Sequence, residues 1–149
     1  VKYQNEIQFH WGVGGLGKKN SSSWIINTFL EQDRVERPWG YYRVLCEGID
    51  YKVKELVINP NSSLSMQRHK HRSETWNLIS GEASIRLIKQ KQHQIEKRLT
   101  IDSTFTIPRY TWHQGVNHSE EPAHIVEVWR GKSNQLNESD IERMVSYDT

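Results

Sequence analysis

The feature that most constrains the fold is a series of short runs of alternating or β-branched residues, each ended by a turn signal. The runs cover residues 51–54, 75–79, 83–88, 95–101, 104–107 and 125–129. Turn-forming residues such as Asn59-Pro60-Asn61 and Ser80-Gly81 separate them. Alternation places every second side chain on one face of a strand. Many short strands with regular turns favour an all-β sandwich or barrel.

The two ends of the chain differ from this pattern. Residues 1–34 include a stretch rich in glycine and serine, and we expect an N-terminal arm that is partly loop. We expect the barrel itself to cover residues 35–149. Residues 137–140 carry helix-capping side chains before residues 141–144, which predicts a short C-terminal helix. Cys46 lies in the apolar stretch Val44-Leu45-Cys46, where we expect a small core residue.

Length and charge exclude several classes of protein. A chain of 149 residues fits one domain. A formal net charge of +2 gives no bulk electrostatic reason to expect nucleic acid or a membrane surface as a partner. No apolar run approaches the roughly 20 residues that cross a bilayer. The single cysteine cannot form an internal disulfide, which agrees with a reducing, cytoplasmic location.

The stretch from Ser65 to Trp76 carries the residues most suited to chemistry. In a strand, Gln67, His69 and His71 would point the same way because they are two residues apart. Glu74 has the wrong parity and joins them only if the chain turns around Arg72-Ser73. Gln67 is a weaker candidate ligand than the histidines.

A further imidazole at His113, after Ile107-Pro108, would complete a mixed nitrogen and oxygen site. We predict one divalent transition metal ion bound by His69, His71, Glu74 and His113. Zinc is the first expectation, and iron, manganese, nickel and cobalt suit the same ligands.

These residues resemble the two cupin motifs, H-x-H…E…G and P…H…N. More closely, the chain resembles the cupin domain of the type II phosphomannose isomerases, which in many bacteria is the C-terminal part of mannose-1-phosphate guanylyltransferase. The resemblance covers Arg37 to about Asp148 and rests on several separate motifs. They are Arg37-Pro38-Trp39-Gly40, Tyr51-Lys52-Val53-Lys54, the string from Ser65 to Trp76, Ser80-Gly81, Ile107-Pro108, His113, Asn117, Glu127-Val128 and Asp140-Ile141-Glu142-Arg143. The chain departs from the family where Tyr110, Gln114 and Trp129 replace glycine, arginine and glutamine.

The resemblance implies a cupin double-stranded β-helix, also called a jelly-roll barrel. It also implies a metal-dependent sugar-phosphate isomerase that interconverts mannose 6-phosphate and fructose 6-phosphate. Lys54 and Glu127 would then line the lumen. The catalytic candidates are Glu127, Lys54 and Arg72, with an unligated Glu74 as another possible base. Arg72, Arg109 and Lys54 are candidates for contact with the sugar phosphate, since guanidinium groups bind phosphate through paired hydrogen bonds.

Three alternatives remain open at this stage. The chain could be a non-catalytic cupin that binds a sugar or sugar nucleotide, or the cupin fragment of a bifunctional mannose-1-phosphate guanylyltransferase. A lumen plugged by Tyr110 or Trp129 would favour a binding role, whereas an open lumen with converging Lys and Arg would favour an enzyme. A metal-dependent dioxygenase could use the same ligands but would not need the Arg37-Pro38-Trp39-Gly40 motif. Trp39 could stack on a sugar, but packing is the more common use of such an aromatic residue.

We also expect a homodimer. The aromatic residues Phe9, Trp11 and Trp24 in the arm suggest a strand that extends the sheet of a partner subunit.

Overall fold

The computed structural model of the chain describes residues 33–88 and 93–144. The chain divides into two compact units, Val1–Asp33 and Arg34–Thr149, and nearly all of the described residues belong to the second. The expected N-terminal arm and its proposed dimer strand lie outside the described residues. The arm and the homodimer therefore remain predictions.

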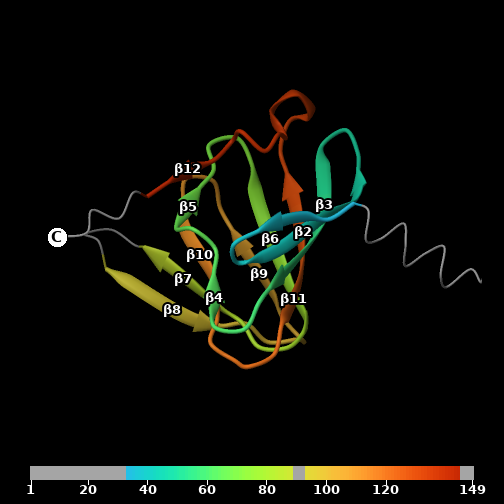
Figure 1. Cartoon of the computed structure of the whole chain (residues 1–149). Helices are drawn as coiled ribbons and strands as arrows, with labels where there is room; N and C mark the ends of the chain where they lie inside the picture. Colours follow the sequence, from blue (N-terminus) through green and yellow to red (C-terminus); the bar gives the residue numbers. More distant parts are fainter. Residues whose placement is uncertain (1–32, 89–92, 145–149) are drawn as a thin grey trace, which may run out of the picture. The chain divides into compact units, whose positions relative to one another are not determined.

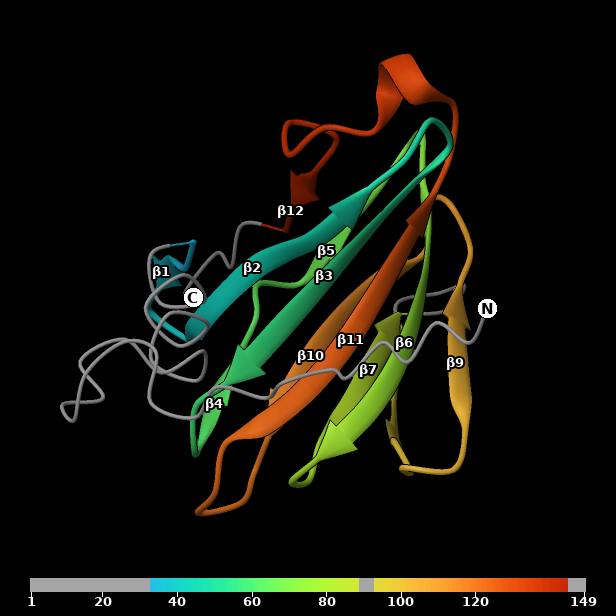
Figure 2. The same cartoon turned by 90° about the vertical axis from the view of Figure 1, so that its right-hand side faces the viewer.

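The described residues form two antiparallel sheets (Figures 1 and 2). The strands are β1 (Val35–Arg37), β2 (Gly40–Glu47), β3 (Tyr51–Ile58), β4 (Ser62–Ser63), β5 (Gln67–Arg68), β6 (Ser73–Ser80), β7 (Ser84–Ile88), β8 (Gln94–Arg98), β9 (Thr104–Ile107), β10 (Trp112–Asn117), β11 (Ala123–Arg130) and β12 (Glu142–Arg143). One sheet has the order β1-β2-β3-β11-β6-β9. The other has the order β12-β5-β10-β7-β8, with β4 also paired to β10. This topology confirms the all-β prediction.

The core lies between the two sheets and is built from the inward-facing side chains of each strand. Leu56 and Ile58 of β3, Trp76 of β6, Ile85 of β7 and Ile125 of β11 belong to one buried cluster. Strands β3 and β11 pair along their whole length, with Lys54 directly opposite Glu127. The alternation that fills the core therefore also turns these two charged side chains into the space between the sheets.

The tail does not form the predicted helix. Within residues 33–88 and 93–144 there is no α-helix, only a 3-10 helix, η2 (Ser133–Gln135). Asn137 does accept the backbone N–H groups of Ser139 and Asp140, as a capping side chain would. The chain then pairs with β5 as strand β12, so sheet hydrogen bonds replace the helix. No helix in this part of the chain is long and apolar enough to span a membrane.

The prediction that Cys46 is a core residue is wrong, because its side chain is exposed. Strand β2 pairs with β1 only from Gly40 to Tyr42. Its second half, from Val44 to Glu47, is exposed, and its register with β3 shifts between Val44 and Cys46. The apolar stretch around Cys46 therefore extends beyond the core.

The turn before β2 depends on Gly40, which has a φ of 140°. A Cβ atom at this position would also overlap the carbonyl oxygen of Val57. We expect Gly40→Ala to lower the free energy of unfolding by at least about 1–3 kcal/mol, measured by urea denaturation. Gly48→Ala is the control, because the three atoms nearest to an added Cβ there all belong to the side chain of Tyr51, which is exposed and can move. Equal effects of the two substitutions would contradict this account.

Candidate functional site

Three of the predicted metal ligands converge in the interior. His69 follows β5, Glu74 lies on β6 and His113 lies on β10. One ligand atom from each lies within 4.8 Å of the other two, and all three side chains are buried. The Nε2 atom of His69 is 2.9 Å from Glu74 Oε1, and the Nε2 atom of His113 is 3.2 Å from Glu74 Oε2.

The hydrogen bonds around both imidazoles direct the Nε2 atoms toward the centre of this cluster. His69 Nδ1 lies 2.6 Å from the carbonyl oxygen of Asp140, and His113 Nδ1 lies 2.9 Å from that of Thr111. A carbonyl oxygen can only accept, so each Nδ1 carries a proton and each Nε2 is the ring nitrogen turned toward Glu74, with Arg72 Nη2 also 3.3 Å from His69 Nε2. A neutral ring in this tautomer can offer the Nε2 lone pair to a metal ion. His113 Nε2 is buried and has no hydrogen-bond partner among the described residues. Two such imidazoles beside a carboxylate are a donor set that fits a divalent transition metal.

The structure places the fourth predicted ligand, His71, outside this cluster. The chain leaves β5 after Arg68 and bends through residues 69–72 before β6 begins at Ser73. His71 is half-buried and lines a separate depression near Asn137 and Asp140. The turn that lets Glu74 join the cluster also removes His71 from the face that carries His69. The sequence already indicates that one regular strand cannot place Glu74 on the same face as His69 and His71.

Gln67 was predicted only as a weaker candidate ligand, but it lies next to the cluster. It lies on β5 directly opposite His113 on β10, and only 9% of its surface is exposed. Its Oε1 atom accepts a hydrogen bond from Ser65 and faces the interior cavity described below. Because Gln67 is buried opposite His113 whereas His71 lines a separate depression, Gln67 is better placed than His71 as a fourth ligand.

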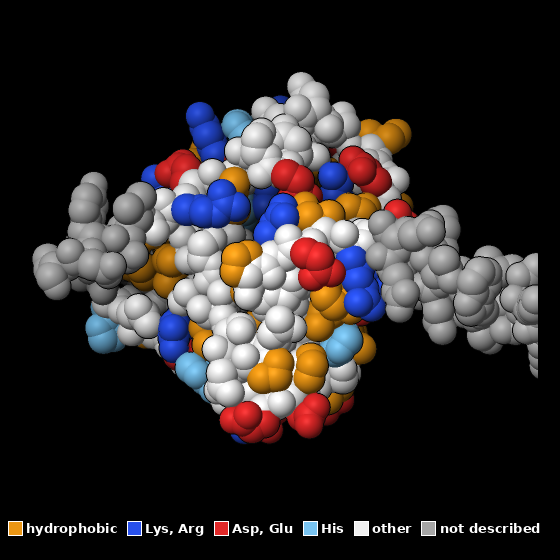
Figure 3. All heavy atoms as spheres, in the orientation of Figure 1, with side chains coloured by type: hydrophobic (Ala, Val, Ile, Leu, Met, Phe, Trp, Pro, Cys, Tyr) orange, Lys and Arg blue, Asp and Glu red, His pale blue; other side chains and the backbone are white. Residues whose placement is uncertain are grey.

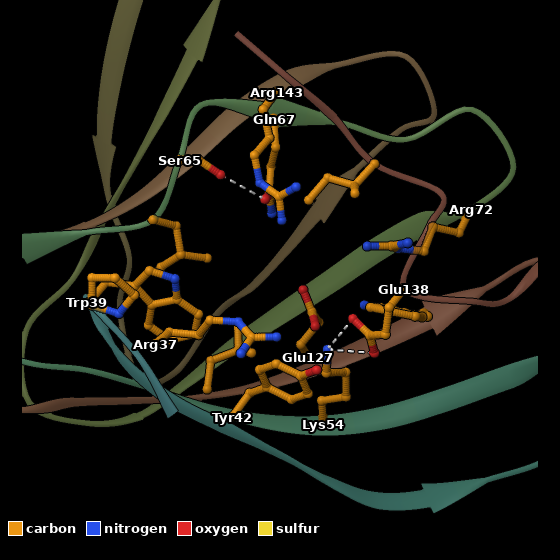
Figure 4. Close-up of a pocket in the computed structure, with 15 residues that line it drawn as sticks. Arg37, Trp39, Tyr42, Lys54, Ser65, Gln67, Arg72, Glu127, Glu138 and Arg143 are labelled. Atoms are coloured by element: carbon orange, nitrogen blue, oxygen red, sulfur yellow. Dashed lines mark hydrogen bonds and ion pairs between the residues drawn. The ribbon is translucent and has the colours of Figure 1, made fainter. Parts of the chain in front are cut away.

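A cavity of about 360 Å³ (Figure 4) is lined by Gln67, which lies opposite His113, and by Arg72, which bonds to Glu74. Arg37, Arg72 and Arg143 point into it from different sides, and Glu127 lies between them. Lys and Arg side chains gather on the face of the molecule between β2 and β12 (Figure 3). The complete lining comprises Arg37, Pro38, Trp39, Tyr42, Lys54, Leu56, Leu64, Ser65, Gln67, Arg72, Glu127, Trp129, Glu138, Ile141 and Arg143.

Of the four other predicted site residues, three line this cavity and Arg109 lies elsewhere. Arg72, Lys54 and Glu127 are each 3% exposed and line the cavity. Arg109 does not, because it is exposed and lines a different depression with Asp50 and Arg130. Arg37, Glu138 and Arg143 line the cavity but were not predicted as site residues. Arg37 and Arg143 appeared only within motifs shared with the family, and no local pattern indicated that their strands would meet around one cavity.

Arg72 links the cavity to the ligand cluster. Its Nε atom donates to Glu74 Oε1 at 2.9 Å, and its Nη1 atom donates to the carbonyl oxygen of Asp140 at 2.9 Å. The guanidinium group also lies over the ring of Trp129, at 3.5 Å from the ring centre. Lys54 lies over the same ring and forms an ion pair with Glu138 at 3.0 Å. Lys52 Nζ also lies 5.3 Å from the centre of this ring, so Trp129 contacts three cations, and it lines the cavity together with Lys54 and Arg72.

Glu74 and Glu127 have opposite pKa shifts although both are buried. Burial raises the pKa of Glu74, but its close contacts with the rings of His113 and His69, and the charges of those rings, bring the pKa well below its ordinary value. The pKa of Glu127 is raised to about 8, first by burial and then by the charge of Glu74, against the opposing effect of Lys54. Trp76 Nε1 donates to both carboxylates, at 3.2 and 3.1 Å. Glu127 is therefore a carboxyl group that can exchange a proton near neutral pH.

This shift predicts how stability depends on pH in the metal-free protein. The unfolded chain loses the Glu127 proton near its ordinary pKa of 4.5, whereas the folded protein keeps it up to about 8. The folded state binds more protons in this window, so the free energy of unfolding falls as pH rises, by at most about 1.4 kcal/mol per pH unit. Denaturant unfolding of wild type and Glu127→Gln across this window should show a weaker dependence in the variant. Identical pH profiles would contradict the shift.

A cupin fold with a buried, mixed nitrogen and oxygen ligand cluster defines the class of this protein. Residues 27–146 match the family described as "Mannose-6-phosphate isomerase C-terminal", and the chain belongs to that family.

Curated relatives and solved structures agree with this assignment. The chain is 34% identical over 127 residues to "Alginate biosynthesis protein AlgA" of Pseudomonas putida, covering 80% of the chain and 25% of the relative. It is 32% identical over 115 residues to "Mannose-1-phosphate guanylyltransferase 2" of Escherichia coli O157:H7, covering 77% of the chain and 22% of the relative. The chain therefore spans about a quarter of the length of these relatives.

Two solved cupin structures share the fold at low sequence identity. The capsular polysaccharide assembling protein CapF of Staphylococcus aureus aligns with a TM-score of 0.64 and 17% identity, over 74% of this chain and 33% of that one. Oxalate decarboxylase of Bacillus subtilis aligns with a TM-score of 0.65 and 16% identity, over 74% of this chain and 29% of that one. These likenesses confirm the cupin fold.

Proposed function

We propose that this chain is a metal-binding cupin domain of the kind found in mannose-1-phosphate guanylyltransferases, and that it binds a phosphorylated mannose. The relatives support this alternative better than a free-standing isomerase, because they are named as guanylyltransferases and polysaccharide biosynthesis proteins. The observation that carries the proposal is the convergence of arginine side chains on one cavity beside the three-ligand cluster.

Arg37 and Arg143 are the best-placed groups for the phosphate. Arg37 donates to a backbone oxygen and lies over the ring of Tyr42, and neither arginine forms an ion pair with a carboxylate of the described residues. By contrast, Arg72 is held by Glu74, and Lys54 is held by Glu138. Unpaired guanidinium groups suit a phosphate dianion because they can donate two hydrogen bonds each. We therefore assign to Arg37 and Arg143 the contact with the phosphate group that was predicted for Arg109.

As a finer proposal, the same cavity supports isomerisation between mannose 6-phosphate and fructose 6-phosphate. A divalent ion held by His69, Glu74 and His113, with zinc as first candidate, would supply positive charge to polarise the substrate oxygens. In its ionised form Glu127 would take the proton from carbon 2 of the aldose and return it to carbon 1, while the hydroxyl proton on the carbon 2 oxygen passes to the carbon 1 oxygen. Trp76 would hold the carboxyl group of Glu127 in place. Lys54 and Glu74 are weaker bases here because each is already engaged by an ionic partner.

A second candidate, binding without turnover, is favoured by a specific observation. The family has an arginine where this chain has Gln114, and Gln114 donates to the carbonyl oxygen of Leu64 instead of lining the cavity. Tyr110 does not plug the lumen, because it is 57% exposed. The open cavity favours an enzyme, whereas the lost arginine favours a binding protein.

Calorimetry and a coupled isomerase assay test the proposal together. Protein stripped of metal and reconstituted with zinc, manganese or cobalt would be titrated with mannose 6-phosphate and with unphosphorylated mannose. We expect binding of the phosphorylated sugar only, and weaker binding after Arg143→Ala. Binding with turnover supports the isomerase, and binding without turnover supports the second candidate. Equal affinity for the two sugars would contradict the proposed phosphate site.

We also propose a homodimer and a cytoplasmic location. Light scattering of the intact chain at micromolar concentration should give the mass of a dimer. A monomer mass under these conditions would contradict the predicted exchange of the N-terminal strand.

A further inference from the structure

Asp140 connects the C-terminal segment to the ligand cluster. It lies in the loop between η2 and β12, and 9% of its surface is exposed. Its carboxylate accepts the backbone N–H of Lys70 through Oδ1 and that of His71 through Oδ2, each at 3.0 Å. Lys70 and His71 form the bend between the ligands His69 and Glu74. The side chain of Asp140 therefore holds the turn that brings these two ligands together.

The backbone carbonyl of Asp140 accepts two hydrogen bonds, one from the ligand His69 and one from Arg72, which bonds to the ligand Glu74. It accepts the Nδ1–H of His69 at 2.6 Å and the Nη1–H of Arg72 at 2.9 Å. Arg72 in turn donates from Nε to Glu74 Oε1 at 2.9 Å. One residue thus contacts His69 directly and Glu74 through a single intervening side chain. Hydrogen bonds of this kind fix the ring orientation of a metal-binding histidine.

We propose that Asp140 is a positioning residue for the metal centre. Its carboxylate fixes the bend at Lys70 and His71, and its carbonyl fixes His69 with Nδ1 protonated and Nε2 facing Glu74. This inference rests on the proposed metal site and deepens it. In the sequence, Asp140 belongs to a motif shared with the family and to a predicted helix cap, and neither predicts this role.

A purely structural role would make a different prediction. Glu142 joins the same two segments, because its Oε2 atom accepts from Arg68 Nε at 2.9 Å and from Nη2 at 2.7 Å. That ion pair is at the surface and contacts none of the three ligands. If Asp140 only attached β12 to β5, Glu142→Gln would affect the ligand cluster as Asp140→Ala does.

The experiment compares wild type with Asp140→Asn, Asp140→Ala and Glu142→Gln. Zinc affinity would be measured by competition with a chromophoric chelator. The ring tautomers of the metal-free proteins would be read from imidazole ¹⁵N chemical shifts. His113 is an internal control, because its Nδ1 is held by Thr111 and not by Asp140.

Asp140→Ala removes the carboxylate that holds the bend but keeps the backbone carbonyl, which is then no longer fixed opposite His69. We expect zinc binding to weaken about 10–100-fold, the usual effect of disturbing the hydrogen bonds that orient a metal ligand. The His69 signals should change from the single Nδ1–H tautomer to a mixture, while those of His113 stay constant. Asp140→Asn should show a smaller change, since its side-chain oxygen still accepts one backbone N–H, and it carries the test if Asp140→Ala does not fold. Glu142→Gln should match wild type in both measurements.

A folded Asp140→Ala with wild-type zinc affinity and an unchanged His69 tautomer would overturn the proposal. So would a Glu142→Gln variant with the same losses as Asp140→Ala. Neither measurement uses a sugar, so a failure of the proposed sugar-phosphate function would appear in calorimetry and not here.

Discussion

Removing either buried histidine, by His69→Ala or His113→Ala, will abolish stoichiometric metal binding, whereas His71→Ala will retain it. The Nε2 atoms of His69 and His113 are both turned toward the Glu74 carboxylate, so either substitution removes one of three converging ligands. We expect a loss larger than the roughly 10–100-fold that follows from removing an outer hydrogen-bond partner. Metal content after dialysis, measured by plasma mass spectrometry, checks this result.

His71→Ala is the matched control, because it changes the same residue type two positions from His69. Its ring lines a separate depression, and only its backbone N–H bonds to Asp140, which the substitution leaves in place. Loss of metal in His71→Ala would show that the bend at residues 69–72 differs from the one described. Retention of metal in His113→Ala would refute the assigned site.

The second large effect concerns Glu127. If the chain is an isomerase, Glu127→Gln will lower the turnover number by about 10²–10⁴-fold, the usual contribution of a positioned general base. Gln cannot accept the carbon-bound proton, yet its oxygen can still accept the Trp76 hydrogen bond. The variant should therefore fold and keep its metal. A coupled assay with mannose 6-phosphate, together with metal analysis of the same sample, measures both properties.

Glu55→Gln provides the comparison for this test. Glu55 is adjacent to Lys54 on β3, but it faces away from the cavity and contacts Arg43 and His124. Its substitution should leave turnover within about twofold of wild type, as expected for a residue with no part in the transition state. Full activity in Glu127→Gln would remove Glu127 from the mechanism and leave the base to be found elsewhere.

Local sequence patterns were sufficient for most of the sheet. Alternation at residues 51–54 and 83–88 predicted strands that the structure contains, because a strand with one buried face must alternate. The same rule explains why Lys54 and Glu127 face the interior. It failed at His71, since alternation applies only while the strand continues, and β5 ends at Arg68.

The features that the sequence could not supply depend on contacts between distant segments. Residues 137–144 have the composition of a capped helix, but pairing of β12 with β5 overrides that local preference. The contact between Asp140 and His69 joins two distant loops, and no spacing rule predicts it. Arg37 and Arg143 meet at one cavity only because β1 and β12 lie at the edges of different sheets.

Anomalous diffraction at the zinc edge, from crystals grown with zinc, would test the central claim most directly. The account predicts one strong peak at about 2.0–2.2 Å from His69 Nε2, His113 Nε2 and an oxygen of Glu74. A peak bound by His71, or well-ordered crystals with no peak between these three side chains, would contradict the metal centre on which the proposed function rests.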